Sequence, residues 1–113
     1  MSIVMIENVL LVFCTSPDFK EARNISRILV EKKLAACCNI IPKISSIYQW
    51  HGKLEESQEI LILIKTTQKK YDQVEKEIKM LHSYSVPEII ATKIVTGSKA
   101  YIDWISENLK TLG

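Results

Sequence analysis

Cys14 and His82 are the two side chains of this 113-residue chain whose types and positions best suit metal chemistry. Cys14 ends an apolar run immediately before a Ser-Pro-Asp sequence that should start a helix, and the partial positive charge of a helix N-terminus lowers the pKa of a thiol. His82 lies in an expected loop and can approach Cys14 if the two halves of the chain stack. Thiolate and imidazole together favour copper or zinc.

Each of these side chains also has a structural interpretation. A free cysteine at a strand end usually packs as a small buried hydrophobe, and a loop histidine is usually exposed. His51 beside Gly52 is most simply a turn residue. The sequence has no nucleophile triad, Walker loop, GxGxxG or HExxH pattern, so the chain is not expected to be an enzyme.

Composition predicts one globular domain over residues 1–113, because 47% hydrophobic residues are enough for a single core. The net charge is +2 and the lysines are interspersed with acids, so nucleic acid is not an expected partner. The longest apolar run, residues 60–64, is far shorter than the ~20 residues of a membrane helix. An odd number of cysteines and the lack of a basic leader favour a cytoplasmic location without a membrane partner.

Two unusually long strands, within residues 35–50 and 54–67, should fold back on each other at His51 and Gly52. About 13 extended residues span ~43 Å, whereas a compact domain of this length is only about 34 Å across. The hairpin tip, with Trp50, should therefore project beyond its own domain and be received by another subunit. Within the first strand, Pro42 marks a bulge or an edge position.

The remaining elements complete the fold prediction. Residues 8–15 read as a buried strand, and Ser16 as the N-cap of the helix that follows. Thr67 is expected to cap a second helix, residues 88–96 to form the last core strand, and Ser98 to cap a final helix. This order predicts an α+β, ferredoxin-like βαββαβ fold with a long central β-hairpin and a C-terminal helix.

The run LAACCNIIPKISSIYQWHGKLEESQEILILIKTT closely resembles the CutA divalent-cation tolerance proteins, as do HSYSVPEII, AYIDWI and the opening FCTSPD. The resemblance extends from about Val9 to Leu109. It implies a cytosolic homotrimer of ferredoxin-like subunits, assembled like the PII signalling proteins, with the long strands pairing across subunits. It also implies a role in tolerance of divalent metals, copper among them.

The resemblance further implies that Cu(II) or another divalent metal binds weakly at Cys14 and His82, which match positions implicated in the family. Two neighbouring positions differ from the family pattern. Leu81 stands where some members carry a second histidine, and Ser83 replaces the usual proline. Because Leu81 cannot ligate and Ser83 leaves the loop less rigid, both differences weaken the expected metal site.

A lateral cleft between subunits, also implied by the resemblance, supports an alternative function. The chain would then be a PII-like signalling or scaffold protein that binds a small molecule or a partner protein. An aromatic and charged lining suits such a ligand. The cleft residues are Tyr48, Trp50, Lys65, Tyr84, Pro87, Glu88 and Trp104.

Overall fold

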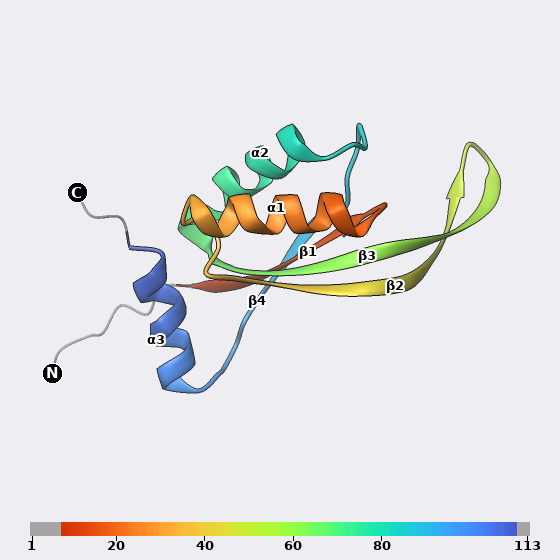
Figure 1. Cartoon of the computed structure of the whole chain (residues 1–113). Helices are drawn as coiled ribbons and strands as arrows, with labels where there is room; N and C mark the ends of the chain where they lie inside the picture. Colours follow the sequence, from red (N-terminus) through yellow and green to blue (C-terminus); the bar gives the residue numbers. More distant parts are fainter. Residues whose placement is uncertain (1–7, 111–113) are drawn as a thin grey trace, which may run out of the picture.

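The computed structural model describes residues 8–110 and contains a four-stranded antiparallel sheet with two helices packed on one face (Figure 1). The strand order is β2-β3-β1-β4, which is the ferredoxin-like order, so the predicted fold class is confirmed. The expected single domain over residues 1–113 stays a prediction, since its two ends lie outside the described residues. The elements are β1 (Val9–Ser16), α1 (Phe19–Glu31), β2 (Cys37–Trp50), β3 (Lys53–Thr67), the 3₁₀ turn η1 (Gln68–Lys70), α2 (Tyr71–Leu81), β4 (Ile89–Lys93) and α3 (Lys99–Asn108).

The main core lies between the sheet and the helices α1 and α2. Side chains alternate across a strand, so every second residue of the central strands β1 and β3 faces these helices. Cys14 and Ile62, for example, are direct partners across the two strands and are both fully buried. The core consists of Val12, Cys14, Ala22, Ile25, Leu29, Leu34, Ala35, Ile60, Ile62, Ile64, Val74 and Ile78.

The β2–β3 hairpin projects well beyond this core, as the strand lengths predicted (Figure 1). The molecule measures 58 × 26 × 21 Å, and its radius of gyration of 15.6 Å exceeds the ~13 Å of a compact chain of this length. Burial along β3 changes from an exposed first half to a buried second half that begins near Ile60. Leu54, close to the tip, is 74% exposed. The projecting part therefore has no cover within the described part of its own chain.

A β-bulge interrupts the hairpin where Pro42 predicted a bulge or an edge position. The pairing of β2 with β3 shifts register between Ile41 and Ile44, and β2 is an edge strand of the sheet. Lys43 has a φ of 62°, which is the left-handed conformation that commonly accommodates the extra residue of a bulge. Both parts of the prediction are confirmed.

Two predicted helix caps are wrong. Asp18, not Ser16, is the N-cap of α1, and its carboxylate accepts the Glu21 backbone N–H at 2.8 Å. Thr67 makes no side-chain cap, and η1 separates it from α2. The cause is the same at both positions, because Ser16 and Thr67 still pair in the β1–β3 ladder, and the helices α1 and α2 begin only three and four residues later. The third predicted cap, Ser98, is confirmed by its 3.2 Å hydrogen bond from the Tyr101 N–H.

The last strand is shorter and more exposed than predicted. β4 covers only Ile89–Lys93 of the expected 88–96, and it lies at the sheet edge. The ladder to β1 ends when the N–H of Ile94 donates to the carbonyl of Val9, the first residue of β1. Because β1 begins at Val9, the residues after Ile94 have no β1 residue to pair with, and the chain continues toward α3.

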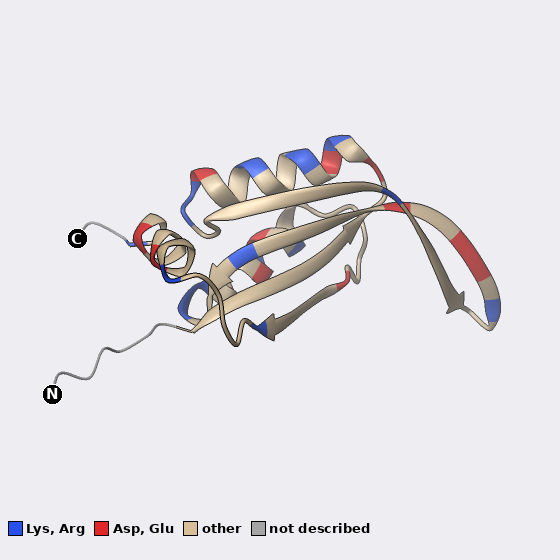
Figure 2. Cartoon of the chain, turned by 90° about the horizontal axis from the view of Figure 1, so that it is seen from below, with Lys and Arg blue, Asp and Glu red and all other residues tan. Residues whose placement is uncertain are grey.

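The face of the sheet opposite α1 and α2 is largely uncovered within the described chain. At one end α3 packs on it, burying Val9, Ala36, Ile105 and Leu109 in a second small cluster. Over the rest of this face the ribbon shows few charged residues (Figure 2). We call this surface the open face; its apolar residues are Leu11, Phe13, Leu61, Leu63 and Ile90. No helix of residues 8–110 is long and apolar enough to cross a membrane.

Replacing Lys33 with glycine should stabilise the fold. Lys33 follows α1 with a φ of 58°, and the helix closes through the Leu34 N–H bonded to the Leu29 carbonyl at 2.9 Å. A left-handed conformation costs a non-glycine residue roughly 1–2 kcal/mol, and glycine forfeits part of that gain through its unfolded-state entropy. We expect K33G to raise the free energy of unfolding by about 1 kcal/mol in urea titrations. K33A keeps the backbone strain, so an equal gain in K33A would contradict this explanation.

Candidate functional site

Cys14 and His82 meet at the carbonyl oxygen of Thr15. His82 follows α2, and its Nε2 lies 2.6 Å from that oxygen. The Sγ of Cys14, one residue earlier in β1, lies 3.7 Å from the same atom. The end of β1 and the loop after α2 therefore bring a thiol and an imidazole to one backbone carbonyl, although 67 residues of sequence separate Thr15 from His82.

The Cys14 thiol is protonated at neutral pH. Its side chain is 0% exposed, and burial raises the pKa of the thiol to about 12, with Glu88 and Glu21 adding to the rise. The expectation that a helix N-terminus would lower this pKa is wrong. α1 starts only at Phe19, and the Asp18 carboxylate already caps it. The structural interpretation of Cys14, a small buried hydrophobe at a strand end, is confirmed.

His82 is buried, at 8% exposure, which overturns the expectation of an exposed loop histidine. Its Nδ1 accepts the Tyr84 N–H at 3.0 Å, so Nε2 carries the proton and donates it to Thr15. The Glu21 carboxylate lies 3.5 Å from Nδ1 and also accepts the Ser16 hydroxyl at 3.2 Å. Both imidazole nitrogens thus have a hydrogen-bond partner, and a metal would have to displace one of them.

A buried glutamate stands beside this pair and was missed at the sequence level. Glu59 is buried, whereas Glu55 and Glu56 of the same strand are exposed. The Tyr84 hydroxyl donates to Glu59 at 3.0 Å. Desolvation, together with this carboxylate, raises the pKa of Tyr84 to about 12. The only signal in the sequence was that Glu59 immediately precedes the apolar run from Ile60.

One chain supplies few side chains that could bind a metal ion at this site. Within residues 8–110 no three His, Cys, Asp or Glu side chains are grouped so as to hold an ion. Cys14 and His82 offer one sulfur and one nitrogen donor, a set that suits copper or zinc in type but supplies half of a four-coordinate site. The remaining ligands of any ion held there must be water or groups from another chain.

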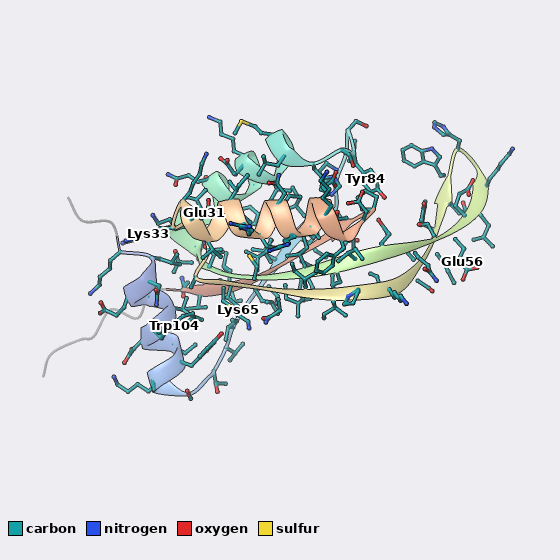
Figure 3. The ribbon with its side chains drawn as sticks, in the orientation of Figure 1. Glu31, Lys33, Glu56, Lys65, Tyr84 and Trp104 are labelled. Carbon is teal, nitrogen blue, oxygen red and sulfur yellow. The ribbon has the colours of Figure 1, made fainter. Side chains whose placement is uncertain are left out.

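The expected cleft residues fall into separate groups within one chain (Figure 3). Lys65 and Trp104 lie beneath the sheet near α3, whereas Tyr84 lies at the opposite end of the core. Tyr48 is on the projecting hairpin, where its hydroxyl is 3.3 Å from that of Ser57, and Trp50 is at the tip. Pro87 and Glu88 lie in the loop between α2 and β4. One chain therefore does not assemble these residues into a single cleft.

The Lys65 group also contains residues that sequence reasoning missed. Asn39 accepts a 2.6 Å hydrogen bond from the Lys65 ammonium, which also lies 5.6 Å from the Tyr101 ring centroid. The Tyr101 ring stacks on Trp104, with ring centroids 5.5 Å apart. Tyr101 lies in α3 and Lys65 in β3, and no local sequence pattern indicates a contact between residues so far apart in the chain.

The buried Cys14 thiol predicts a loss of stability at alkaline pH. The unfolded thiol loses its proton near its ordinary pKa of 9.0, whereas the folded one keeps it until about 12. Between these values the folded state binds more protons, so the free energy of unfolding falls as pH rises, by about 1.4 kcal/mol per unit. From pH 8 to about 10.5, we expect wild type to lose about 2 kcal/mol more than C14A in urea titrations. Equal losses in the two proteins would contradict the assignment; C37A should behave like wild type, since Cys37 is partly exposed.

The fold and the site together define a ferredoxin-like α+β protein with a buried thiol and imidazole at the end of its first strand. Comparisons with known proteins then assign the chain to a family. The profile of the family "CutA1 divalent ion tolerance protein" matches residues 10–108. The divalent-cation tolerance protein CutA of Thermus thermophilus is 46% identical over 97 residues, which cover 86% of this chain and 94% of that protein. The chain belongs to the CutA1 divalent ion tolerance protein family.

Two further relatives differ in the location that their names give. A solved structure from Archaeoglobus fulgidus, described as a periplasmic divalent cation tolerance protein CutA, matches with a TM-score of 0.88 and 41% identity, over 90% of this chain and 99% of that one. A chloroplastic CutA protein of Arabidopsis thaliana is 36% identical over 101 residues, which cover 89% of this chain and 56% of that protein. Family membership alone therefore does not assign this chain to a compartment.

Proposed function

We propose that this chain serves divalent-metal tolerance by binding Cu(II) or a similar ion, weakly, through Cys14 and His82 in a cytoplasmic homotrimer. The observation that carries the proposal is the convergence of the Cys14 thiol and the His82 imidazole on the Thr15 carbonyl. The role is binding and not catalysis. Membership of a divalent ion tolerance family supports the class of ligand.

Weak binding follows from the state of the two ligands. The Cys14 thiol has to lose its proton, and its raised pKa opposes that step until the metal supplies compensating charge. His82 has to give up its hydrogen bond to Thr15 or the one from Tyr84. Glu21, 3.5 Å from His82, offers a negative charge that favours a cation at this place. Affinity should therefore rise with pH, because binding releases the thiol proton.

Titration of the intact protein with Cu(II) tests this site. C14A/H82A should weaken binding about tenfold or more, since it removes both proposed protein ligands. The matched control is C37A/H51A, which removes the same two residue types from a partly exposed strand position and from the exposed hairpin turn. Circular dichroism checks that each variant is folded. Unchanged affinity in folded C14A/H82A, or an equal loss in C37A/H51A, would refute the assignment.

A homotrimer is part of the proposal because residues 8–110 leave two surfaces without cover. The hairpin projects from the core, and the open face exposes apolar side chains on the sheet. A cytoplasmic location is proposed because three cysteines cannot all pair within one chain and a reducing compartment keeps them free. Cell fractionation tests the location directly.

A second candidate function is a PII-like sensor or scaffold that binds a small molecule or a partner protein between subunits. The favouring observation is the Lys65, Tyr101 and Trp104 group, which combines an ammonium with two stacked and partly exposed rings. In this proposal the hairpin of a neighbouring copy, with Tyr48 and Trp50, would complete the cleft. A metabolite screen by thermal shift should find ligands whose effect is lost in K65A. No shift at millimolar ligand would count against this function.

A further inference from the structure

The outward side of α1 carries a basic surface. Lys20, Arg23 and Arg27 are all exposed and follow one another at spacings of three and four residues, which places them on one side of the helix. Between Lys20 and Arg27 the helix rises about 10.5 Å. Neither Lys20 nor Arg23 forms an ion pair with another described residue, and Arg27 has a loose contact with Glu31 at 3.7 Å, where both side chains are solvent-exposed. We call these three residues, with Phe19, the α1 basic face.

The α1 basic face also includes apolar residues and a shallow depression. Phe19 is 51% exposed at its start, and Ile28 lies at its margin. The surface contains an open, shallow depression of about 520 Å³, which is lined by residues of α1 alone, among them Phe19, Arg23 and Arg27. Phenylalanine and arginine are both enriched at the cores of protein interfaces relative to the rest of the surface.

This surface faces away from the proposed subunit contacts. α1 and α2 lie together on one side of the sheet, and the open face is on the other side (Figure 1, Figure 2). An assembly through the open face and the hairpin would therefore leave the α1 basic face directed outward. Its charge does not serve the core of the chain either, because the buried residues of α1 are Ala22, Ile25, Ser26 and Leu29 on the opposite side of the helix.

We propose that the α1 basic face docks an acidic amphipathic helix of a partner protein. Carboxylates at spacings of three and four residues on such a helix would match the cations of Lys20, Arg23 and Arg27, and an apolar side chain beside them would pack on Phe19. The acids Asp18 and Glu31 bound this surface at either end of α1. Lys20, Arg23 and Arg27 together span about two turns of α1, a length that matches a short acidic helix better than the extended surface of an anionic membrane.

Binding of a labelled peptide to the full-length protein tests the proposal. The probe is an alanine-rich helical peptide of about 15 residues, long enough to be partly helical in water, with Glu on one side at spacings of three and four and one Leu beside them. The comparison peptide has Gln in place of each Glu. Fluorescence anisotropy at low and high ionic strength should show binding of the Glu peptide that weakens with salt, and at least tenfold weaker binding of the Gln peptide.

Charge reversal on the protein locates the surface. R23E/R27E should weaken binding of the Glu peptide about tenfold or more, whereas K69E/K76E, with the same change in net charge at exposed residues of η1 and α2, should change it less than about twofold. Absence of binding to wild type would overturn the proposal, as would an equal loss in both double variants. Equal or stronger binding of wild type to phosphatidylserine vesicles would also overturn it, in favour of a membrane surface.

Discussion

Replacing Leu63 with lysine should convert the proposed trimer to a monomer. Leu63 lies in β3 on the open face, directly opposite Phe13 of β1. In the proposed homotrimer, this apolar surface is removed from water against other copies. A lysine there would put a charge into each contact, and an unpaired buried charge costs several kcal/mol. Each of the three subunits would carry that cost, and the summed penalty exceeds the free energy of association that a modest interface supplies.

The measurement is light scattering after size exclusion, which should give three times the chain mass of 12.9 kDa for wild type and 12.9 kDa for L63K. The matched control is M80K, which makes the same change in charge at a residue of α2 that is 65% exposed on the helical side. M80K should keep the wild-type mass. A monomeric wild type, or an L63K protein that keeps the wild-type mass, would contradict assembly through the open face.

The sequence predicted the long hairpin well because two local signals agreed. Strand-like runs on both sides of a turn at Gly52 determined the pairing, and their lengths alone required a projection beyond the core. The bulge at Pro42 followed from the missing backbone N–H of proline. These features depend on residues close together in the chain, and such features can be derived from a single sequence.

The ends of the helices were harder to predict, since long-range pairing competes with local capping there. Ser16 and Thr67 have the side chains of good N-caps, but each lies at one end of the β1–β3 ladder, opposite Ile60 and Val9 respectively. Strand pairing that continues through both positions displaced the predicted caps. The strand partner of a residue is not visible in its neighbours, so local propensity gave the wrong answer at both ends of the same ladder.

The protonation states of the site residues depend even more on residues that are far away in the sequence. The types of Cys14 and His82 were evident in the sequence, but their burial depends on α1 and on the loop after α2 closing over the end of β1. A helix N-terminus close in sequence indicated a lowered thiol pKa. Burial outweighed that effect and reversed the direction of the shift. Residue type could therefore be read from the sequence, whereas protonation state required the fold.

The two faces of the sheet follow from the same alternation along β1 and β3. Even-numbered positions such as Val12 and Ile62 are fully buried under α1 and α2, whereas the odd-numbered Phe13 and Leu63 are only partly covered within the described chain. The first set stabilises the subunit by itself. The second set keeps part of its surface exposed in the single chain, and the proposed assembly would cover that part, so assembly and folding should be perturbed by substitutions on different faces.

The helical side of the sheet should be the more sensitive to loss of volume. Ile78 of α2 is 0% exposed and belongs to the main core. Its replacement by alanine removes buried methyl and methylene groups and leaves a cavity, which typically costs 2–5 kcal/mol. We expect I78A to lower the free energy of unfolding by about that amount in urea titrations. Because stabilities of small domains are about 5–15 kcal/mol, this single change would remove a large part of the total.

The control for I78A is M80A, two residues later in the same helix. Both changes introduce alanine and so alter helix propensity in the same favourable direction, but Met80 is largely exposed and should change stability by no more than about 0.5 kcal/mol. If M80A costs as much as I78A, the outer side of α2 must itself be covered in the assembly. In that case the helices, and not the open face, would hold the subunits together, and L63K would leave the mass unchanged. The comparison of L63K with M80K and the comparison of I78A with M80A therefore both test whether the subunits associate through the open face.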